Sequence, residues 1–171
     1  TLDTQLNVFA DFQPELSPQE RRAPFLFLGN IDPGLQLNVL EQMEERPRLV
    51  AADTMNFWIE GKREVILDVI RHVDVIFMDE GELRQFTGEL NVIKAAKEII
   101  SLGPQVVLAK RGEHGVIQFT ADSTFAAPAY PLEKVVDPTG AGDCFAGGFM
   151  GYLAATGDLN HDGFRRATVM G

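Results

Sequence analysis

The sequence predicts an α/β fold, a three-layer αβα sandwich whose mostly parallel sheet ends in an antiparallel hairpin. Short apolar runs alternate with stretches that repeat apolar residues at helical spacing, which is the pattern of βαβ units. From Gly115 this alternation stops, and two short apolar runs follow on either side of a polar turn. The chain has 171 residues, of which 45% are apolar, so we expect residues 1–171 to form one α/β domain.

Four continuous apolar runs are the expected parallel strands, because a strand covered on both faces needs no polar alternation. They lie at residues 25–28, 49–52, 75–78 and 106–109. Apolar residues three and four positions apart predict helices over residues 35–43, 65–73 and 93–100.

The ends of the chain add weaker expectations. Residues 116–119 and 124–127 are the expected hairpin, and residues 134–136 are a further strand that leads into a glycine-rich turn. Leu6, Val8 and Phe9 predict a strand ahead of a loop over residues 14–22. After the glycine-rich turn, an apolar stripe at helical spacing is expected to pack in the core: Phe145, Phe149, Tyr152 and Leu153.

Several acids and glycines lie just past the carboxyl ends of expected strands, where open α/β sheets bind their ligands. They are Asp53, Glu82, Gly112, Asp137 and Asp143. Loops are polar wherever they fall, which is the plainer explanation. That all five fall on one side of the sheet favours a ligand site.

The segment from Asp137 to Asp143, D-P-T-G-A-G-D, is the most informative in the chain. A glycine-rich turn that enters a helix leaves backbone N–H groups unpaired at the positive end of the helix dipole, where an anion can bind. Phosphate repels an aspartate placed there, so Asp143 suggests a chemical task such as proton abstraction. The alternative is that Asp143 is an acid stabilised by the dipole and that the glycines only make the turn.

This heptad resembles the second motif of the ribokinase-like (PfkB) family of carbohydrate and nucleoside kinases, D-T-x-G-A-G-D. The resemblance implies that Asp143 is the catalytic base and that the amides of Gly140, Ala141 and Gly142 form an anion hole for the transferred phosphoryl group.

The family also places a monovalent cation against the first acid of the motif. By resemblance, Asp137 and the carbonyl of Thr139 would hold a potassium ion. Equally, Asp137 could cap the turn by accepting from the Thr139 or Gly140 amide. Pro138 departs from the family's more common threonine and should stiffen the turn.

Two further segments resemble family motifs. Asp79-Glu80-Gly81-Glu82 is similar to N-x-x-E, which implies that Glu82 acts near Mg²⁺ and the phosphates through water; Asp79 departs from asparagine. An acid-rich helix start is the alternative. Lys110 to Gly115 resembles the nucleotide loop T-x-G-x-x-G, in which Gly112 and Gly115 permit close backbone approach, and Lys110 or Arg111 would supply positive charge.

The resemblance implies an ATP-dependent phosphotransferase that uses Mg²⁺ to phosphorylate a hydroxymethyl group of a sugar or nucleoside. The alternative is a catalytically silent nucleotide-binding regulatory module, against which the intact Asp143 argues. A dinucleotide-binding oxidoreductase would need G-x-G-x-x-G after the first strand, and residues 29–34 do not supply it. The family's sugar-binding motif is not found, so we expect the C-terminal, nucleotide-binding part of a longer kinase, whose substrate and lid part lies upstream. Any homodimer would form through that lid.

Composition excludes other classes of protein. The net charge of -10 argues against a nucleic-acid partner, which needs a basic surface. No apolar run is long enough for a membrane helix and no signal peptide is found, so we expect no membrane partner and a cytoplasmic location. The single cysteine, Cys144, excludes an intrachain disulfide and is expected to be a small core residue.

Overall fold

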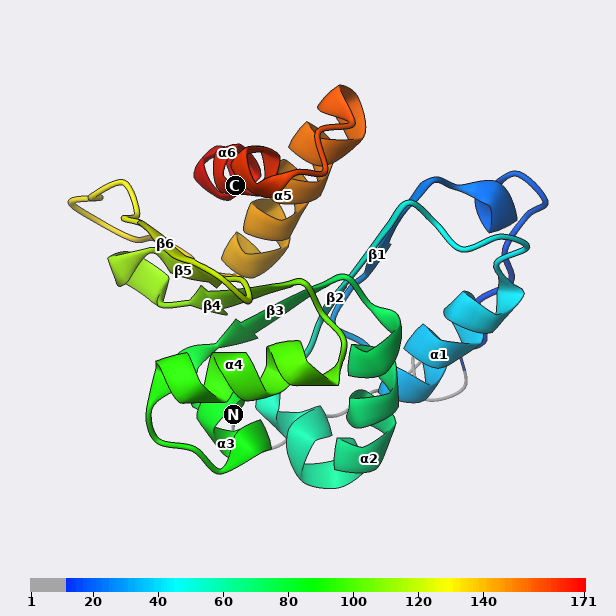
Figure 1. The fold of residues 1–171 in the computed structure, drawn as a ribbon, viewed down its shortest axis with the longest axis horizontal. Helices are drawn as coiled ribbons and strands as arrows, with labels where there is room; N and C mark the ends of the chain where they lie inside the picture. The colour runs from blue at the N-terminus through cyan, green and yellow to red at the C-terminus, as the bar shows by residue number, and fades with distance from the viewer. Residues whose placement is uncertain (1–11) are drawn as a thin grey trace.

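The computed structural model describes residues 12–171 and shows a three-layer α/β sandwich (Figure 1). Its middle layer is a six-stranded sheet in the order β1-β2-β3-β4-β5-β6. The strands are β1 (Phe25–Leu28), β2 (Leu49–Asp53), β3 (Val75–Asp79), β4 (Val106–Lys110), β5 (Val116–Phe119) and β6 (Thr124–Ala127). The first four are parallel, and β5 and β6 form an antiparallel hairpin against β4. The predicted fold class is confirmed.

Helices cover both faces of the sheet. In Figure 1 the first four helices lie below the sheet and the last two lie above it. They are α1 (Pro33–Gln42), α2 (Asn56–His72), α3 (Glu80–Thr87), α4 (Val92–Leu102), α5 (Ala141–Thr156) and α6 (His161–Met170). Two short 3-10 helices, η2 (Glu20–Arg22) and η3 (Gly112–His114), lie in loops.

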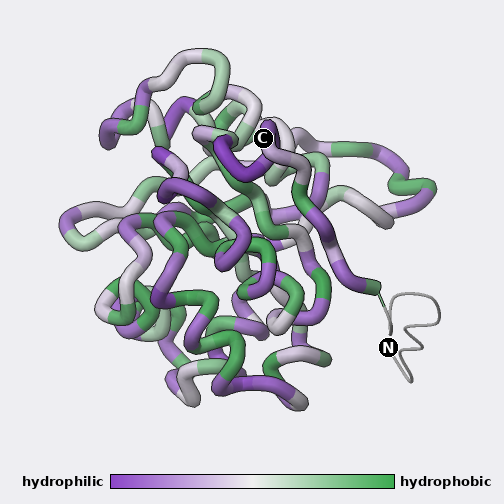
Figure 2. Tube along the Cα trace, turned by 90° about the vertical axis from the view of Figure 1, so that its right-hand side faces the viewer, coloured by the Kyte–Doolittle hydropathy of each residue, from purple (hydrophilic) through white to green (hydrophobic). Residues whose placement is uncertain are grey.

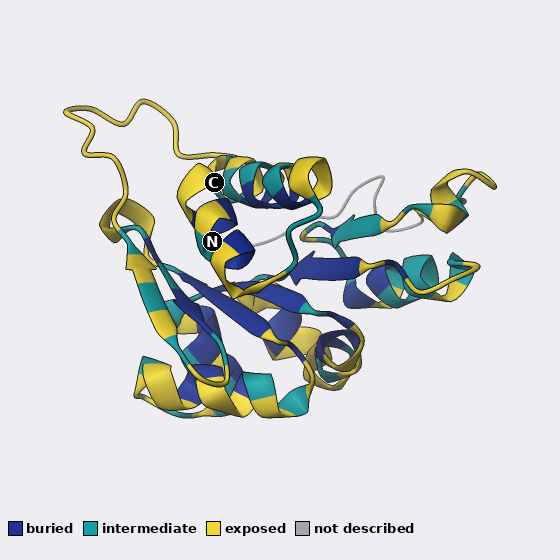
Figure 3. Ribbon diagram, turned by 45° about the horizontal axis from the view of Figure 1, so that its top comes forward, coloured by how far each residue is buried: buried dark blue, intermediate teal, exposed yellow. Residues whose placement is uncertain are grey.

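The sheet separates two hydrophobic cores, because successive side chains of a strand point to opposite faces. On β3, Ile76 and Met78 pack with the helices of the first face, and Phe77 packs beneath α5 and α6. The rings of Phe77 and Phe149 meet edge to face with centroids 5.4 Å apart. Figure 3 shows the central strands as buried, and in Figure 2 the helices alternate between hydrophobic and hydrophilic residues.

Most elements follow the sequence pattern. All four apolar runs are strands, the hairpin has the predicted bounds, and Phe149 and Leu153 are buried with Phe145 and Tyr152 packed beside them. The loop expected over residues 14–22 contains η2. The strand predicted from Leu6, Val8 and Phe9 lies outside the described residues.

Two predictions are wrong. Residues 134–136 form no strand, and Val135 and Val136 are 59% and 87% exposed. Two valines favour extended backbone, but a strand needs a neighbour to satisfy its hydrogen bonds, and no described strand lies beside them. Residues 128–139 instead form an exposed connection from β6 to α5 (Figure 3). Cys144 is exposed on α5 rather than part of the core.

Candidate functional site

Three strands end in charged residues at the same edge of the sheet. Asp53 is the last residue of β2, Asp79 of β3 and Lys110 of β4. Asp79 and Lys110 are register partners in the parallel ladder, so β3 and β4 end level, whereas Asp53 pairs with Phe77, two residues before the end of β3. The edge is therefore lined by two carboxylates and an ammonium group, which supports the prediction of a ligand site at the carboxyl ends of the strands.

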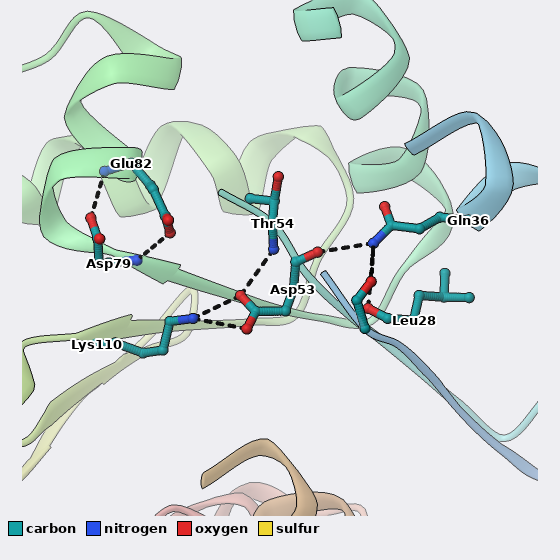
Figure 4. A network of polar contacts seen from close by, with 8 residues as sticks. Leu28, Gln36, Asp53, Thr54, Asp79, Glu82 and Lys110 are labelled. Carbon is teal, nitrogen blue, oxygen red and sulfur yellow. Dashed lines mark hydrogen bonds and ion pairs between the residues drawn. The ribbon is translucent and has the colours of Figure 1, made fainter. Parts of the chain in front are cut away.

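Asp53 and Lys110 form the central ion pair of this edge (Figure 4). The Nζ atom of Lys110 donates to both carboxylate oxygens of Asp53, at 2.8 and 2.9 Å. Asp53 is only 4% exposed, and its Oδ1 also accepts from the Thr54 amide at 2.9 Å. Burial raises the pKa of Asp53 and Lys110 opposes this shift, while the nearby charge of Asp143 adds to it. The ion pair thus compensates for a carboxylate that is buried at the site.

A buried glutamine fixes the backbone beneath this ion pair. The Nε2 atom of Gln36 donates to the carbonyls of Gly29 and Asp53 at 2.8 and 2.9 Å, and it lies 3.4 Å from the Leu28 carbonyl (Figure 4). Gln36 is 3% exposed and belongs to α1. It therefore ties the ends of β1 and β2 together from outside the sheet.

Asp79 and Glu82 cap α3 reciprocally. Oδ1 of Asp79 accepts from the Glu82 amide, and Oε2 of Glu82 accepts from the Asp79 amide, both at 2.7 Å (Figure 4). Glu82 is 5% exposed, and burial raises its pKa to about 7. The hydrogen bond from the Asp79 amide and the charge of Lys110 oppose this shift, while the charges of Asp79 and Asp53 add to it. The predicted Mg²⁺ residue thus has a structural task in this structure and lies within the same charge cluster as Lys110.

The glycine-rich turn begins α5, which packs on the face of the sheet opposite to α3. Gly140 is the N-cap residue with φ +79°, a left-handed conformation that glycine adopts without strain. The Ala141 amide donates to the Pro138 carbonyl at 3.2 Å. The amides of Gly142 and Asp143 have no hydrogen-bond partner within the described part of the chain. Two donors are therefore free at the helix N-terminus beside the exposed Asp143.

Asp137 stabilises the approach to this turn. Its Oδ1 accepts from the Thr139 amide at 2.9 Å, and hydrogen bonding by the Thr139 side chain and amide lowers the pKa of Asp137. This contact supports the alternative that Asp137 caps the turn. The cation role of Asp137 and Thr139 stays a prediction.

A cavity of about 650 Å³ lies between the nucleotide loop and the start of α5. Its lining includes Lys110, Gly112, Gly115, Ala141 and Gly142. The predicted nucleotide loop (residues 110–115) and the glycine-rich turn at the start of α5 (residues 140–142, the anion turn) are far apart in the sequence. Both face this one cavity. Its volume is in the range of ordinary small-molecule sites.

Gly115 and Arg111 shape the loop side of this cavity. Gly115 has φ +90°, and a Cβ there would lie 2.1 Å from the Ala127 carbonyl oxygen, so the hairpin can pass this close only with glycine. Arg111 donates from Nε to Glu80 Oε1 at 2.8 Å, which joins the loop to α3. Of the two basic residues considered for the nucleotide, Lys110 therefore lines the cavity and Arg111 is paired with a helix.

The sequence indicated Asp53 only as one of five residues past strand ends, without its partner, and it did not indicate Gln36. Asp53 was noted as an acid at a strand end, but its partner is 57 positions away. Its best signal was its place directly after a strand that is buried throughout. Gln36 lies in an amphipathic stretch, where a polar residue is expected to be exposed. It is buried because of tertiary packing, which the sequence pattern does not show.

Residues 27–169 match the pfkB family of carbohydrate kinases. The chain belongs to this family. A cytidine kinase from Thermococcus kodakarensis is 39% identical over 134 residues, which are 75% of this chain and 47% of that protein. A nucleoside kinase from Methanocaldococcus jannaschii is 26% identical over 151 residues, which are 87% of this chain and 48% of that protein. The chain thus spans about half the length of these relatives.

Solved structures share the fold. A double mutant of fructokinase from Vibrio cholerae, with bound fructose, ADP and potassium ion, matches with a TM-score of 0.74 over 94% of this chain and 54% of that chain, at 22% identity. Aminoimidazole riboside kinase from Salmonella enterica, complexed with aminoimidazole riboside and an ATP analog, matches with a TM-score of 0.72 over 87% of this chain and 54% of that chain, at 23% identity. At such identities the likeness shows the architecture.

The described residues lack two kinds of feature. None of their helices is both long and apolar enough to cross a membrane. They also hold no group of three or more histidine, cysteine, aspartate or glutamate residues arranged to bind a metal ion.

Proposed function

We propose that residues 1–171 are the nucleotide-binding, C-terminal part of a longer kinase that transfers the γ-phosphoryl group of ATP to a hydroxymethyl group of a sugar or nucleoside. One observation carries the proposal: the exposed Asp143 lies in the first turn of α5, where the amides of Gly142 and Asp143 are unpaired, and Gly142 and Lys110 line one cavity. Anion donors beside an acid that can serve as a general base are what phosphoryl transfer requires.

Each group has a distinct task in this proposal. Asp143 accepts the proton of the substrate hydroxyl as the phosphoryl group arrives. The free amides and the ammonium of Lys110 stabilise the negative charge on the phosphoryl oxygens. The cavity between Gly115 and Gly142 accommodates the rest of the nucleotide, because both walls expose backbone that can approach it closely.

The residues present fit ATP with Mg²⁺ when the phosphates supply most of the metal ligands. Mg²⁺ keeps several waters and needs few protein carboxylates. In this proposal Glu82 acts through such waters and loses its proton when the cation approaches, which its raised pKa supports. We further propose that Asp137 and the Thr139 carbonyl hold a potassium ion that stiffens the turn.

The relatives support this proposal, because they include a cytidine kinase and a nucleoside kinase. Whether the acceptor is a sugar or a nucleoside depends on a part of the protein that this chain does not include. We also expect a cytoplasmic enzyme whose partners are small molecules and not nucleic acid or membrane.

The test is Asp143→Asn in the full-length protein, assayed against a panel of sugars and nucleosides. Loss of the general base should lower kcat by at least about 100-fold. ATP binding should stay intact or become slightly tighter, because a charge that repels phosphate is removed. A near-normal kcat would show that Asp143 is not the base. A wild type that binds ATP but phosphorylates no acceptor would instead favour the silent regulatory module.

A further inference from the structure

We propose that Asp53 is a positioning residue, which holds the Lys110 ammonium against the start of α5 so that this cation meets the phosphates of a bound nucleotide. This inference rests on the proposed function, because it needs a nucleotide in the cavity. It assigns a role to a buried acid of β2 that the phosphoryl-transfer steps above do not use.

Asp53 is itself held firmly. Its side chain accepts from the Thr54 amide, and its backbone carbonyl accepts from the buried Gln36, at 2.9 Å each. Asp53 is 4% exposed, so it has little room to change rotamer. A carboxylate fixed at both its backbone and its side chain can impose a position on a longer and more flexible partner.

Lys110 is such a partner. A lysine stem has four rotatable bonds, and an unpaired ammonium would spread over many positions. Here two of its three N–H donors are directed to the two oxygens of Asp53, at 2.8 and 2.9 Å. The third donor remains for another acceptor, and the Lys110 side chain keeps 22% exposure.

The place where Lys110 is held is the anion turn. A Cβ built on Gly142 would lie 3.6 Å from Lys110 Nζ, which puts the ammonium beside the first turn of α5. Lys110, Ala141 and Gly142 line the same cavity. The first turn of α5 and the ammonium therefore face one cavity, although one belongs to a helix and the other to the end of β4.

Charge balance gives this arrangement its importance. The chain carries a net charge of -10, and Asp53, Glu82 and Asp143 all lie near the turn. Without a cation held in place, nucleotide phosphates would meet mainly carboxylates, and repulsion would oppose binding. A purely structural ion pair, which only neutralises a buried acid, would make no such contribution to phosphate binding.

The experiment separates these two roles by comparing ligands with and without phosphates. Calorimetric titration of the full-length protein with ADP and with adenosine gives two dissociation constants. The Kd of adenosine divided by the Kd of ADP is the preference ratio, and it reports the contribution of the phosphates. Lys110→Met should lower this ratio by about tenfold or more, as expected for losing one charge-assisted contact. Asp53→Asn should lower it to a similar extent, and the double variant should fall no further, because the two residues act as one unit.

Asp74→Asn is the matched control. Asp74 is another partly buried carboxylate, paired with Arg46 at 2.9 Å and accepting from the Val50 amide, but it lies just before β3 at the opposite edge of the sheet. It should lower stability without changing the preference ratio. If Asp53→Asn does not fold, Asp53→Glu keeps the charge pair, displaces the ammonium, and should lower the ratio as well.

Two results would overturn the inference. An unchanged ratio in the folded Asp53 variants, with a lowered ratio in Lys110→Met, would mean that Lys110 needs no positioning. A raised ratio in Asp53→Asn would mean that Asp53 competes with phosphate for the ammonium. A wild type that binds ADP no better than adenosine would contradict the proposed nucleotide site itself, so the two failures are distinguishable.

Discussion

Replacing Glu82 by glutamine should remove part of the pH dependence of the unfolding free energy. Glu82 is buried within the capping box of α3, and burial raises its pKa from 4.5 to about 7. Glutamine has nearly the same shape, and its amide oxygen can still accept from the Asp79 amide. Unlike Glu82, it carries no charge at any pH. The variant therefore isolates the cost of holding an ionised carboxylate in this position.

The sign and size of the effect follow from proton linkage. Between the unfolded pKa and the folded pKa, the native state binds the extra proton, so the unfolding free energy falls as pH rises. This contribution is complete below pH 4.5 and is lost as pH rises through about 7. At about 1.4 kcal/mol per pH unit, the total is up to about 3 kcal/mol. Asp53 also has a raised pKa and interacts electrostatically with Glu82, so the difference between the two proteins reports Glu82 together with this coupling.

The assay is urea unfolding of the full-length wild type and of Glu82→Gln at pH values from 5 to 8. The variant should gain on the wild type as pH rises, by about 2–3 kcal/mol over this interval. Parallel pH profiles would refute the reasoning, because Glu82 would then be ionised throughout.

Glu80→Gln is a control from the same helical turn with the opposite sign. Despite some burial, hydrogen bonds from Arg84 and Arg111 lower the pKa of Glu80. Its contribution is therefore present above the unfolded pKa of 4.5 and is lost as pH falls through the folded value. Glu80→Gln should lose stability relative to the wild type at pH 7 and approach it in acid.

Three other perturbations test separate parts of the structure. Gly115→Ala should lower the unfolding free energy by roughly 2–3 kcal/mol in urea titration, because the added Cβ would meet backbone. Gly112 faces open space, so Gly112→Ala should cost only about 1 kcal/mol. Equal losses in the two variants would contradict the close approach at Gly115. Phe149→Ala should cost about 3–5 kcal/mol by the same measurement, since this ring is fully buried against Phe77; a loss below 1 kcal/mol would mean that the core refills. Potassium should raise kcat more than sodium does, and Asp137→Ala should remove the difference, while equal wild-type rates in potassium, sodium and a bulky organic cation would leave Asp137 as a turn cap only.

The elements with the strongest patterns were predictable because they depend on local information. The run Val75-Ile76-Phe77-Met78 is apolar throughout, as a strand between two helical layers must be, and it forms the centre of the sheet. Residues 134–136 have a similar local preference but no neighbouring strand. Hydrogen bonding to a neighbouring strand, and not the local preference for extended backbone, therefore determined which of these two segments became a strand.

The site was predictable as separate pieces and not as an arrangement. The glycine turn and the nucleotide loop each have a short motif, and both line one cavity in the structure. The contact between Asp53 and Lys110 joins two strands that are separated by β3, with Asp53 level with Phe77 and Lys110 level with Asp79, and no spacing along the chain encodes this arrangement. The pattern Asp79-x-x-Glu82 could be recognised as acidic, but its reciprocal capping required backbone geometry to be seen.

The exposed connection over residues 128–139 makes α5 and α6 a contiguous terminal unit that lies apart from the other helices (Figure 1). Units of this kind can open before the rest of a protein unfolds, and their amide hydrogens then exchange together. The anion turn belongs to this unit, whereas Lys110 belongs to the sheet. A nucleotide that bridges the two would close the unit onto the sheet and slow its exchange in proportion to occupancy. Ligand concentration would then set how often this helix pair opens from the sheet.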